Sequence, residues 1–158
     1  MIIACLSTVR VTDSLDGSVH EAEKCWYDTA RWPDWVDELS RIVSVEGDWP
    51  REGATVVWQS GPAGRGRVRE TVISYEPLGG QTVAVEDESI TGTQQVAFEP
   101  TADGVEVSLS LDYSIKRRSP LTPLLDLLFV RRPMTISLTR TLSRFSVALA
   151  ESREPSVG

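Results

Sequence analysis

The sequence predicts a single α+β domain in which a curved antiparallel sheet packs against a long C-terminal helix. Three observations indicate this fold. Segments rich in β-forming residues follow one another from 41 to 116, with turn signals roughly every 8 to 15 residues. The last of these segments, 105–116, alternates strictly between apolar and polar residues. An amphipathic segment over 134–149 then repeats its apolar residues at steps of three and four, as helices that lie on a sheet do.

The composition is that of a globular domain with an acidic surface. The 158 residues are 41% hydrophobic and 25% charged, with a net charge of −7, and one core is expected at this length. Because a negative surface repels phosphate backbones, no nucleic-acid partner is predicted. The longest apolar run, 124–130, contains Asp126 and is far shorter than the roughly 20 residues that cross a bilayer. No stable membrane insertion is therefore expected, and without a recognisable export signal the predicted location is cytoplasmic.

A strand and two short helices are predicted at the start of the chain. Ile, Val and Thr are frequent over 1–12, which favours a first strand. Asp16 or Ser18 is placed to cap the helix that follows. Apolar residues recur at helical spacing in this helix, at Val19, Ala22, Trp26 and Ala30. Pro33 starts a second short helix, because proline is tolerated in the first turn but cannot continue the preceding helix.

Six further strands are predicted between 41 and 116, which makes a sheet of seven. Turn signals separate them at 47–50, 61–64, 77–80, 89–92 and 102–104. The intervals between turns leave no room for crossover helices, so neighbouring strands are expected to pair as antiparallel hairpins.

The final helix is predicted to begin at Ser119 or Thr122, each of which precedes a proline. Pro133 is expected to kink or break it, because proline lacks an amide donor and clashes with the preceding turn. Beyond that break the apolar stripe consists of Met134, Leu138, Leu142, Phe145 and Leu149. The domain is predicted to span 1–150, with 151–158 as a disordered polar tail.

Four local motifs accompany this order of elements. They are Asp28-x-x-x-Trp32-Pro33-x-Trp35, Gly53-Ala54-Thr55-Val56, Arg69-Glu70-Thr71-Val72-x-x-Tyr75-Glu76-Pro77 and Phe98-Glu99-Pro100-Thr101-x-Asp103-Gly104. With them, almost the whole chain resembles the SRPBCC superfamily, whose START-like fold is called helix-grip, and in particular its polyketide cyclase/dehydrase-like branch. The resemblance implies a cavity between the sheet and the terminal helix that binds lipids, sterols, polyketides or other hydrophobic molecules. It does not imply one reaction, because one fold hosts many activities.

The leading hypothesis is therefore a protein that binds a small hydrophobic ligand, such as a lipid, polyketide or aromatic metabolite, in an apolar cavity. The residues predicted to line it are Trp35, Trp58, Phe98, Leu109, Leu111, Tyr113, Phe129, Met134 and Leu138. Two alternatives stay open: a polyketide cyclase/dehydrase-type enzyme that uses a few polar cavity residues, and a lipid carrier that docks at membranes. The formation of a homodimer is also left open.

Chemistry-bearing residues are sparse. The only histidine, His20, lies in the first turn of a surface helix, and Cys5 and Cys25 are read as buried thiols, so neither a hydrolytic triad nor a metal or cofactor site is predicted. A cyclase would need polar groups that orient carbonyls and move a proton. The catalytic candidates are Tyr113, Arg69, Glu70 and Tyr75. Because Arg69 and Glu70 are neighbours in one strand, they point to opposite faces of the sheet.

Two further segments have a predicted structural role. Residues 61–66 are rich in glycine but lack the spacing of a phosphate-binding loop, so they are interpreted as a hairpin loop. The leucine-rich segment 121–130, followed by Arg131 and Arg132, is interpreted either as a lid over the cavity or as a helix that lies in a membrane interface. The lid is preferred because the net negative charge opposes binding to anionic lipids.

Overall fold

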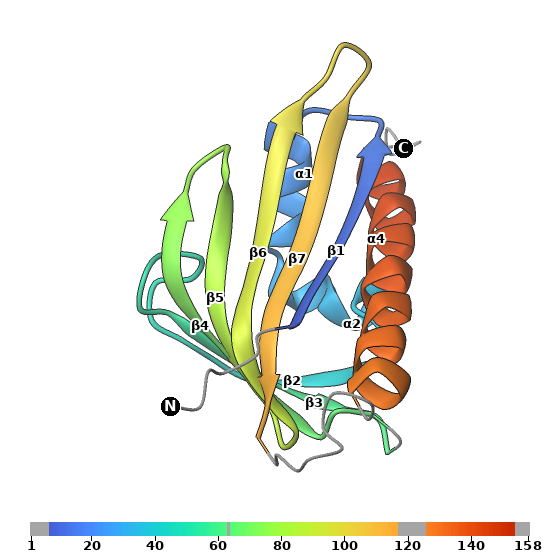
Figure 1. The fold of residues 1–158 in the computed structure, drawn as a ribbon. Helices are drawn as coiled ribbons and strands as arrows, with labels where there is room; N and C mark the ends of the chain where they lie inside the picture. The colour runs from blue at the N-terminus through green and yellow to red at the C-terminus, as the bar shows by residue number, and fades with distance from the viewer. Residues whose placement is uncertain (1–6, 63, 117–125, 154–158) are drawn as a thin grey trace.

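One antiparallel sheet of seven strands forms the body of the protein (Figure 1). The computed structural model describes residues 7–62, 64–116 and 126–153. The strands are β1 (Ser7–Leu15), β2 (Leu39–Glu46), β3 (Thr55–Ser60), β4 (Arg67–Glu76), β5 (Gly80–Glu86), β6 (Ile90–Pro100) and β7 (Val105–Ile115). Their spatial order is β1-β7-β6-β5-β4-β3-β2, with every neighbouring pair antiparallel. The predicted seven-stranded sheet built from hairpins is thus confirmed.

The first strand closes the sheet on the side of the last strand. β1 pairs with β7 from Ser7 opposite Tyr113 to Leu15 opposite Val105. The strand predicted over 1–12 therefore continues to Leu15, while residues 1–6 lie outside the described part of the chain. The paired residues of β1 and β7 are about a hundred positions apart in the sequence. This pairing therefore holds the start of the described chain against its last hairpin.

The two short helices follow β1 as expected, with one correction. The helix α1 (Val19–Trp26) is capped by Ser18, whose hydroxyl accepts from the amide of Glu21 while the Glu21 carboxylate accepts from the amide of Ser18. Its apolar face ends at Trp26, and Ala30 is exposed because α1 has already ended there. A single 3₁₀ turn, η1 (Thr29–Arg31), leads to α2 (Trp32–Trp35), which has a proline in its first turn.

The C-terminal helical segment changes from π- to α-helical geometry just before Pro133. A π-helical turn, η2 (Asp126–Arg131), comes first, and α4 (Arg132–Arg153) follows with this proline in its first turn. The helix starts predicted at Ser119 or Thr122 lie outside the described residues. At the other end α4 continues to Arg153, whose guanidinium pairs with Glu21 at 3.2 Å. The first three residues of the predicted tail are therefore helical, and 154–158 are outside the described residues.

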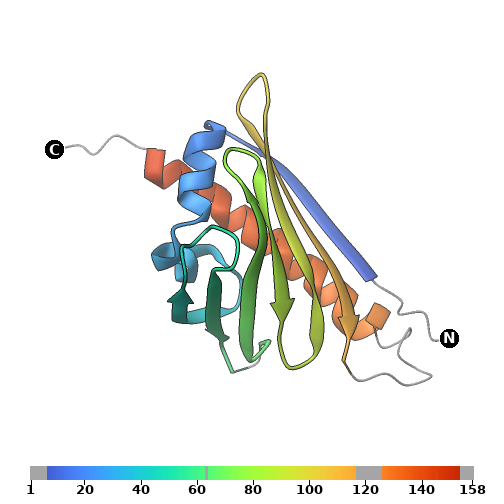
Figure 2. The same ribbon diagram turned by 90° about the vertical axis from the view of Figure 1, so that its left-hand side faces the viewer.

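The core lies between the sheet and the helices. Figure 2 shows α4 running across one face of the sheet, with α1 and α2 on that same side. We call this the inner face. The alternation predicted in β7 is confirmed, because its odd-numbered residues from Val105 to Tyr113 are buried and the even-numbered ones are not. The buried residues of α4 include all five of the predicted stripe, together with Thr141 and Ala148. This is the helix-grip arrangement expected from the sequence.

Candidate functional site

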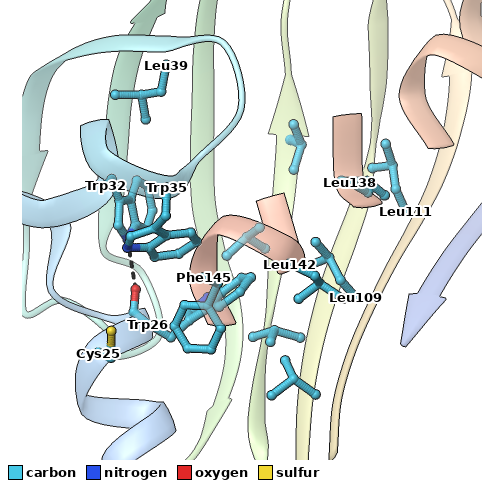
Figure 3. Close-up of a cluster of buried hydrophobic side chains, with 14 of the residues drawn as sticks. Cys25, Trp26, Trp32, Trp35, Leu39, Leu109, Leu111, Leu138, Leu142 and Phe145 are labelled. Carbon is cyan, nitrogen blue, oxygen red and sulfur yellow. Dashed lines mark hydrogen bonds between the residues drawn. The ribbon is translucent and has the colours of Figure 1, made fainter. Parts of the chain in front are cut away.

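A cluster of aromatic rings occupies one end of the space between the sheet and α4 (Figure 3). The centroids of the Trp26 and Trp35 rings are 4.8 Å apart, and the ring of Phe145 lies 5.1 Å from the first and 5.0 Å from the second. Trp32 donates from Nε1 to the backbone oxygen of Trp26 at 2.8 Å. Edge-to-face contacts of this kind favour packing beyond the area they bury, so these rings form a rigid end wall.

Beside this wall lies a small inner cavity of about 40 Å³. Trp35, Trp58, Leu109 and Leu138 contribute apolar surface to its lining, from α2, β3, β7 and α4 respectively. The polar lining residues are Asp37, Arg65, Glu70, Gln81, Gln94, Ser137 and Thr141. A water molecule needs roughly 10–15 Å³ of such space, whereas ligand pockets usually measure about 300–1,000 Å³. The cavity is therefore smaller than the resemblance implies, because the large side chains of α4 and the aromatic wall fill most of the interior.

An outer pocket of about 240 Å³ lies next to the inner cavity. Three segments surround it: the β3–β4 loop, the turn between β5 and β6, and the junction of η2 with α4. Two residues, Arg65 and Ser137, line both the outer pocket and the inner cavity. Only a few side chains therefore separate a shielded interior from a pocket that opens at the surface.

The inner cavity contains a buried indole without a hydrogen-bond partner. Trp35 is only 1% exposed, and among the described residues its Nε1 finds no acceptor. Trp58, by contrast, donates from Nε1 to Glu70 Oε2 at 2.6 Å. A buried donor left unpaired costs about 1–3 kcal/mol. An acceptor atom placed beside Trp35 would satisfy this donor.

Glu70 is buried on the inner face, and its carboxyl group favours the protonated form. Burial raises the pKa of Glu70, and the Trp58 indole and the Arg65 charge oppose that effect. Because the folded pKa exceeds the unfolded one, the contribution of Glu70 to stability is full at acidic pH. It is lost as the pH rises through the folded pKa.

We therefore expect Glu70→Gln to gain stability relative to the wild type as the pH rises from about 4 to 7, since glutamine keeps the acceptor but does not titrate. The gain should not exceed about 1.4 kcal/mol per pH unit. Urea unfolding at several pH values measures it, with Glu99→Gln on the exposed end of β6 as the matched control. A difference between Glu70→Gln and the wild type that stays constant with pH would contradict the assignment.

The predicted ligand-lining residues divide into three groups. Trp35, Trp58, Leu109 and Leu138 line the inner cavity. Phe129 and Met134 line the outer pocket, where the Phe129 side chain is 68% exposed. Phe98, Leu111 and Tyr113 are buried in the core and line neither space.

The four catalytic candidates do not come together. Glu70 faces the inner cavity, whereas Arg69 is exposed on the opposite face of the sheet. The Tyr75 ring packs against Tyr27 with centroids 5.5 Å apart, and Tyr113 lies on β7 away from both spaces. The opposite orientations expected for Arg69 and Glu70 are confirmed, and no pair from this set shares a hydrogen bond among the described contacts.

Tyr113 instead fastens the start of the terminal helix. Its hydroxyl donates to one oxygen of the Asp126 carboxylate, and the hydroxyl of Ser7 donates to the other. Burial, together with the hydrogen bond and charge of Asp126, raises the pKa of Tyr113. The phenol therefore stays protonated as a donor, and the three residues join η2 to β1 and β7.

Sequence reasoning missed two residues at the boundary between the spaces. By sequence, Arg65 is only part of a glycine-rich hairpin loop, and Ser137 belongs to no motif. The alternation of β4 places a side chain on one face or the other, but Arg65 precedes that strand and has no such constraint. The direction of the Arg65 side chain is set by an ion pair with Asp87, 22 residues further along the chain. No local sequence pattern predicts that pair.

Other reactive groups lie apart from this site. His20 is exposed on α1, and Cys25 is a buried free thiol, while Cys5 lies outside the described residues. In the described ranges, no three His, Cys, Asp or Glu side chains gather as a metal site would require. Over the same residues, no helix is both long enough and apolar enough to cross a membrane.

Comparison with solved structures identifies the fold class of the protein. A norcoclaurine synthase from Thalictrum flavum, solved in complex with dopamine and hydroxybenzaldehyde, superposes with a TM-score of 0.71 at 13% identity, over 96% of this chain and 91% of that one. A protein of Thermus thermophilus gives 0.75 at 17% identity, over 94% and 100%. An uncharacterised protein from Rhizobium leguminosarum gives 0.73 at 14% identity, over 94% and 97%. At these identities the similarity shows a shared helix-grip fold.

The sequence then assigns the chain to a family. Residues 7–150 match the family described as polyketide cyclase / dehydrase and lipid transport, and the chain belongs to it. No curated protein matches the chain by sequence. The resemblance to the polyketide cyclase/dehydrase-like branch, drawn from the motifs above, is thereby confirmed.

Proposed function

We propose that this protein binds a small, mainly apolar ligand, which enters through the outer pocket and extends into the inner cavity. The two spaces adjoin at Arg65 and Ser137, so a ligand that spans both would pass between these side chains. Besides the apolar contacts, an acceptor atom on the ligand would add a hydrogen bond from Trp35 Nε1. The proposal is one of binding, and it assigns no reaction.

The observation that carries this proposal is the unpaired indole of Trp35, a residue that lines the inner cavity. If the cavity served packing alone, the fold would be more stable with that donor paired or removed. A ligand acceptor would satisfy it, while burial of the ligand hydrocarbon would contribute roughly 25 cal/mol per Å². Membership of a family described by polyketide cyclisation and lipid transport supports the same class of ligand.

The proposal predicts that the neutral fluorescent probe N-phenyl-1-naphthylamine binds saturably, and that Ser137→Trp lowers its affinity at least tenfold. An indole at position 137 would fill the boundary between the two spaces. Probe fluorescence measures the affinity. Ser143→Trp, at an exposed position of α4, is the matched control and should bind like the wild type.

Two results would contradict the proposal. The first is the absence of saturable binding to the wild type. The second is an equal affinity of the two tryptophan variants, once thermal unfolding shows that both are folded.

The cytoplasmic location and the lack of a nucleic-acid partner remain predictions from the sequence. The net charge of −7 supports the lack of a nucleic-acid partner. The role of 121–130 as a lid also remains a prediction, because 121–125 lie outside the described residues.

A further inference from the structure

The guanidinium of Arg65 is held in place on two sides. Its Nε donates to Asp87 Oδ2 at 2.8 Å. The other carboxylate oxygen of Asp87 accepts from the amides of Ser89 and Ile90, at 2.8 and 2.9 Å, so Asp87 is itself fixed by the β5–β6 turn. The central carbon of the guanidinium lies 5.7 Å from the centroid of the Trp58 ring. These contacts fix the plane of the guanidinium at the boundary of the two spaces.

The terminal nitrogen Nη2 of the same group is buried and unpaired. Arginine has five N–H donors, and the contact with Asp87 uses the one on Nε. The side chain is 16% exposed, and within the described residues no acceptor reaches Nη2. A buried charged donor without a partner costs more than a neutral one. An acceptor is therefore favoured at this nitrogen.

Asp87 is the carboxylate paired with Arg65, through Nε, and among the described residues no carboxylate bonds to Nη2. Among the described residues that line the two spaces, Arg65 has the only basic side chain. Burial raises the pKa of Glu70 and favours its neutral form. Asp37 pairs with Arg144 at 3.2 Å, and the Asp87 carboxylate is shared between Arg65 Nε and the turn amides. Glu38 is the remaining carboxylate of the lining, and it is exposed at the rim of the outer pocket.

We infer that the ligand is an acid, whose carboxylate binds Nη2 of Arg65 while its apolar body lies along Trp58 and Leu138. The planar guanidinium matches a carboxylate, and charge-assisted hydrogen bonds of this type are about twice as strong as neutral ones. This inference rests on the proposed function and adds the chemical class of the ligand. It assigns Arg65 as the residue that selects an anionic over a neutral ligand of the same shape.

The test compares 2-naphthoate with 2-naphthamide, which have the same shape and differ in charge, by isothermal titration calorimetry at pH 7.5. The wild type should bind the acid at least tenfold more tightly than the amide. Arg65→Gln should lose this preference by weakening naphthoate binding about tenfold, with little change for the amide. Arg67→Gln removes an equal charge from an exposed position two residues away and should keep the preference.

Arg65→Lys distinguishes the loss of the charge from a loss of folding. It keeps the positive charge and should therefore retain part of the preference for the acid. Equal affinity of the wild type for the two probes would overturn the inference. So would an Arg65→Gln variant that weakens both probes to the same extent, since that pattern belongs to a structural role. Either result leaves the proposed function standing if N-phenyl-1-naphthylamine still binds. If that neutral probe does not bind either, the proposed function fails as well.

Discussion

Phe145→Ala is expected to lower the free energy of unfolding by about 3–5 kcal/mol, which is the usual cost of truncating a buried aromatic residue. The ring is fully buried on α4 and packs against both Trp26 and Trp35. Those two indoles belong to separate helices, so alanine would leave a cavity that neither can fill without leaving its own contacts. The loss is a large part of the roughly 5–15 kcal/mol that stabilises a domain.

Urea unfolding measures this loss. Val147→Ala on the same helix is the matched control, because its side chain is 58% exposed and surface truncations usually change stability by less than about 0.5 kcal/mol. Equal losses for the two variants would show that α4 does not hold the aromatic wall in place. A lower affinity of the Phe145 variant for N-phenyl-1-naphthylamine would additionally link the wall to the ligand site.

Gly92→Ala is expected to cost about 3 kcal/mol, at the upper end of the range for overpacking. A Cβ at Gly92 of β6 would lie 2.2 Å from the carbonyl oxygen of Asp112 and 2.9 Å from the Cα of Tyr113, both in β7. These are backbone atoms of a paired strand, so relief requires the two strands to separate locally. The clash lies next to the tyrosine that fastens Asp126, and the start of the terminal helix should loosen with it.

The matched control is Gly61→Ala in the β3–β4 loop, where an added Cβ meets no atom of the described residues within 4 Å. A glycine replaced without strain usually gains about 0.4–1 kcal/mol, because the unfolded chain loses freedom. The two substitutions should therefore differ in sign when urea unfolding is compared. A Gly92 variant as stable as the wild type would mean that β6 and β7 are more loosely paired than the structure has them.

Much of the fold could be predicted because its signals are local. The alternation over 105–116 placed every inward side chain of β7 from Val105 to Tyr113 correctly, since the period of a strand is fixed by its backbone. Asp16 and Ser18 were the two predicted caps for the start of α1, and the structure has Ser18 in that role, in a capping box with Glu21. The extent of α1 was harder, because Ala30 kept the helical spacing although the chain had already turned at Trp26.

The candidate site was predictable only in part. The apolar lining from Trp58, Leu109 and Leu138 follows from which face each element buries. The polar side of the site depends on contacts between segments far apart in sequence. Arg65 is oriented by Asp87, and Tyr113 meets Asp126 and Ser7, which come from opposite ends of the chain.

From the sequence alone follow the order of the strands and helices, the inward faces of the last strand and the terminal helix, and the family to which the chain belongs. Backbone periodicity and capping act over a few residues, so they can be recognised before the chain is folded. Only the tertiary structure decided how much space remains beneath α4 and which polar groups face it. The volume of a cavity is a small difference between a large enclosed space and the side chains that fill it. It is set by Phe145, Leu138 and the indoles of Trp26 and Trp35 together, and by no single segment alone.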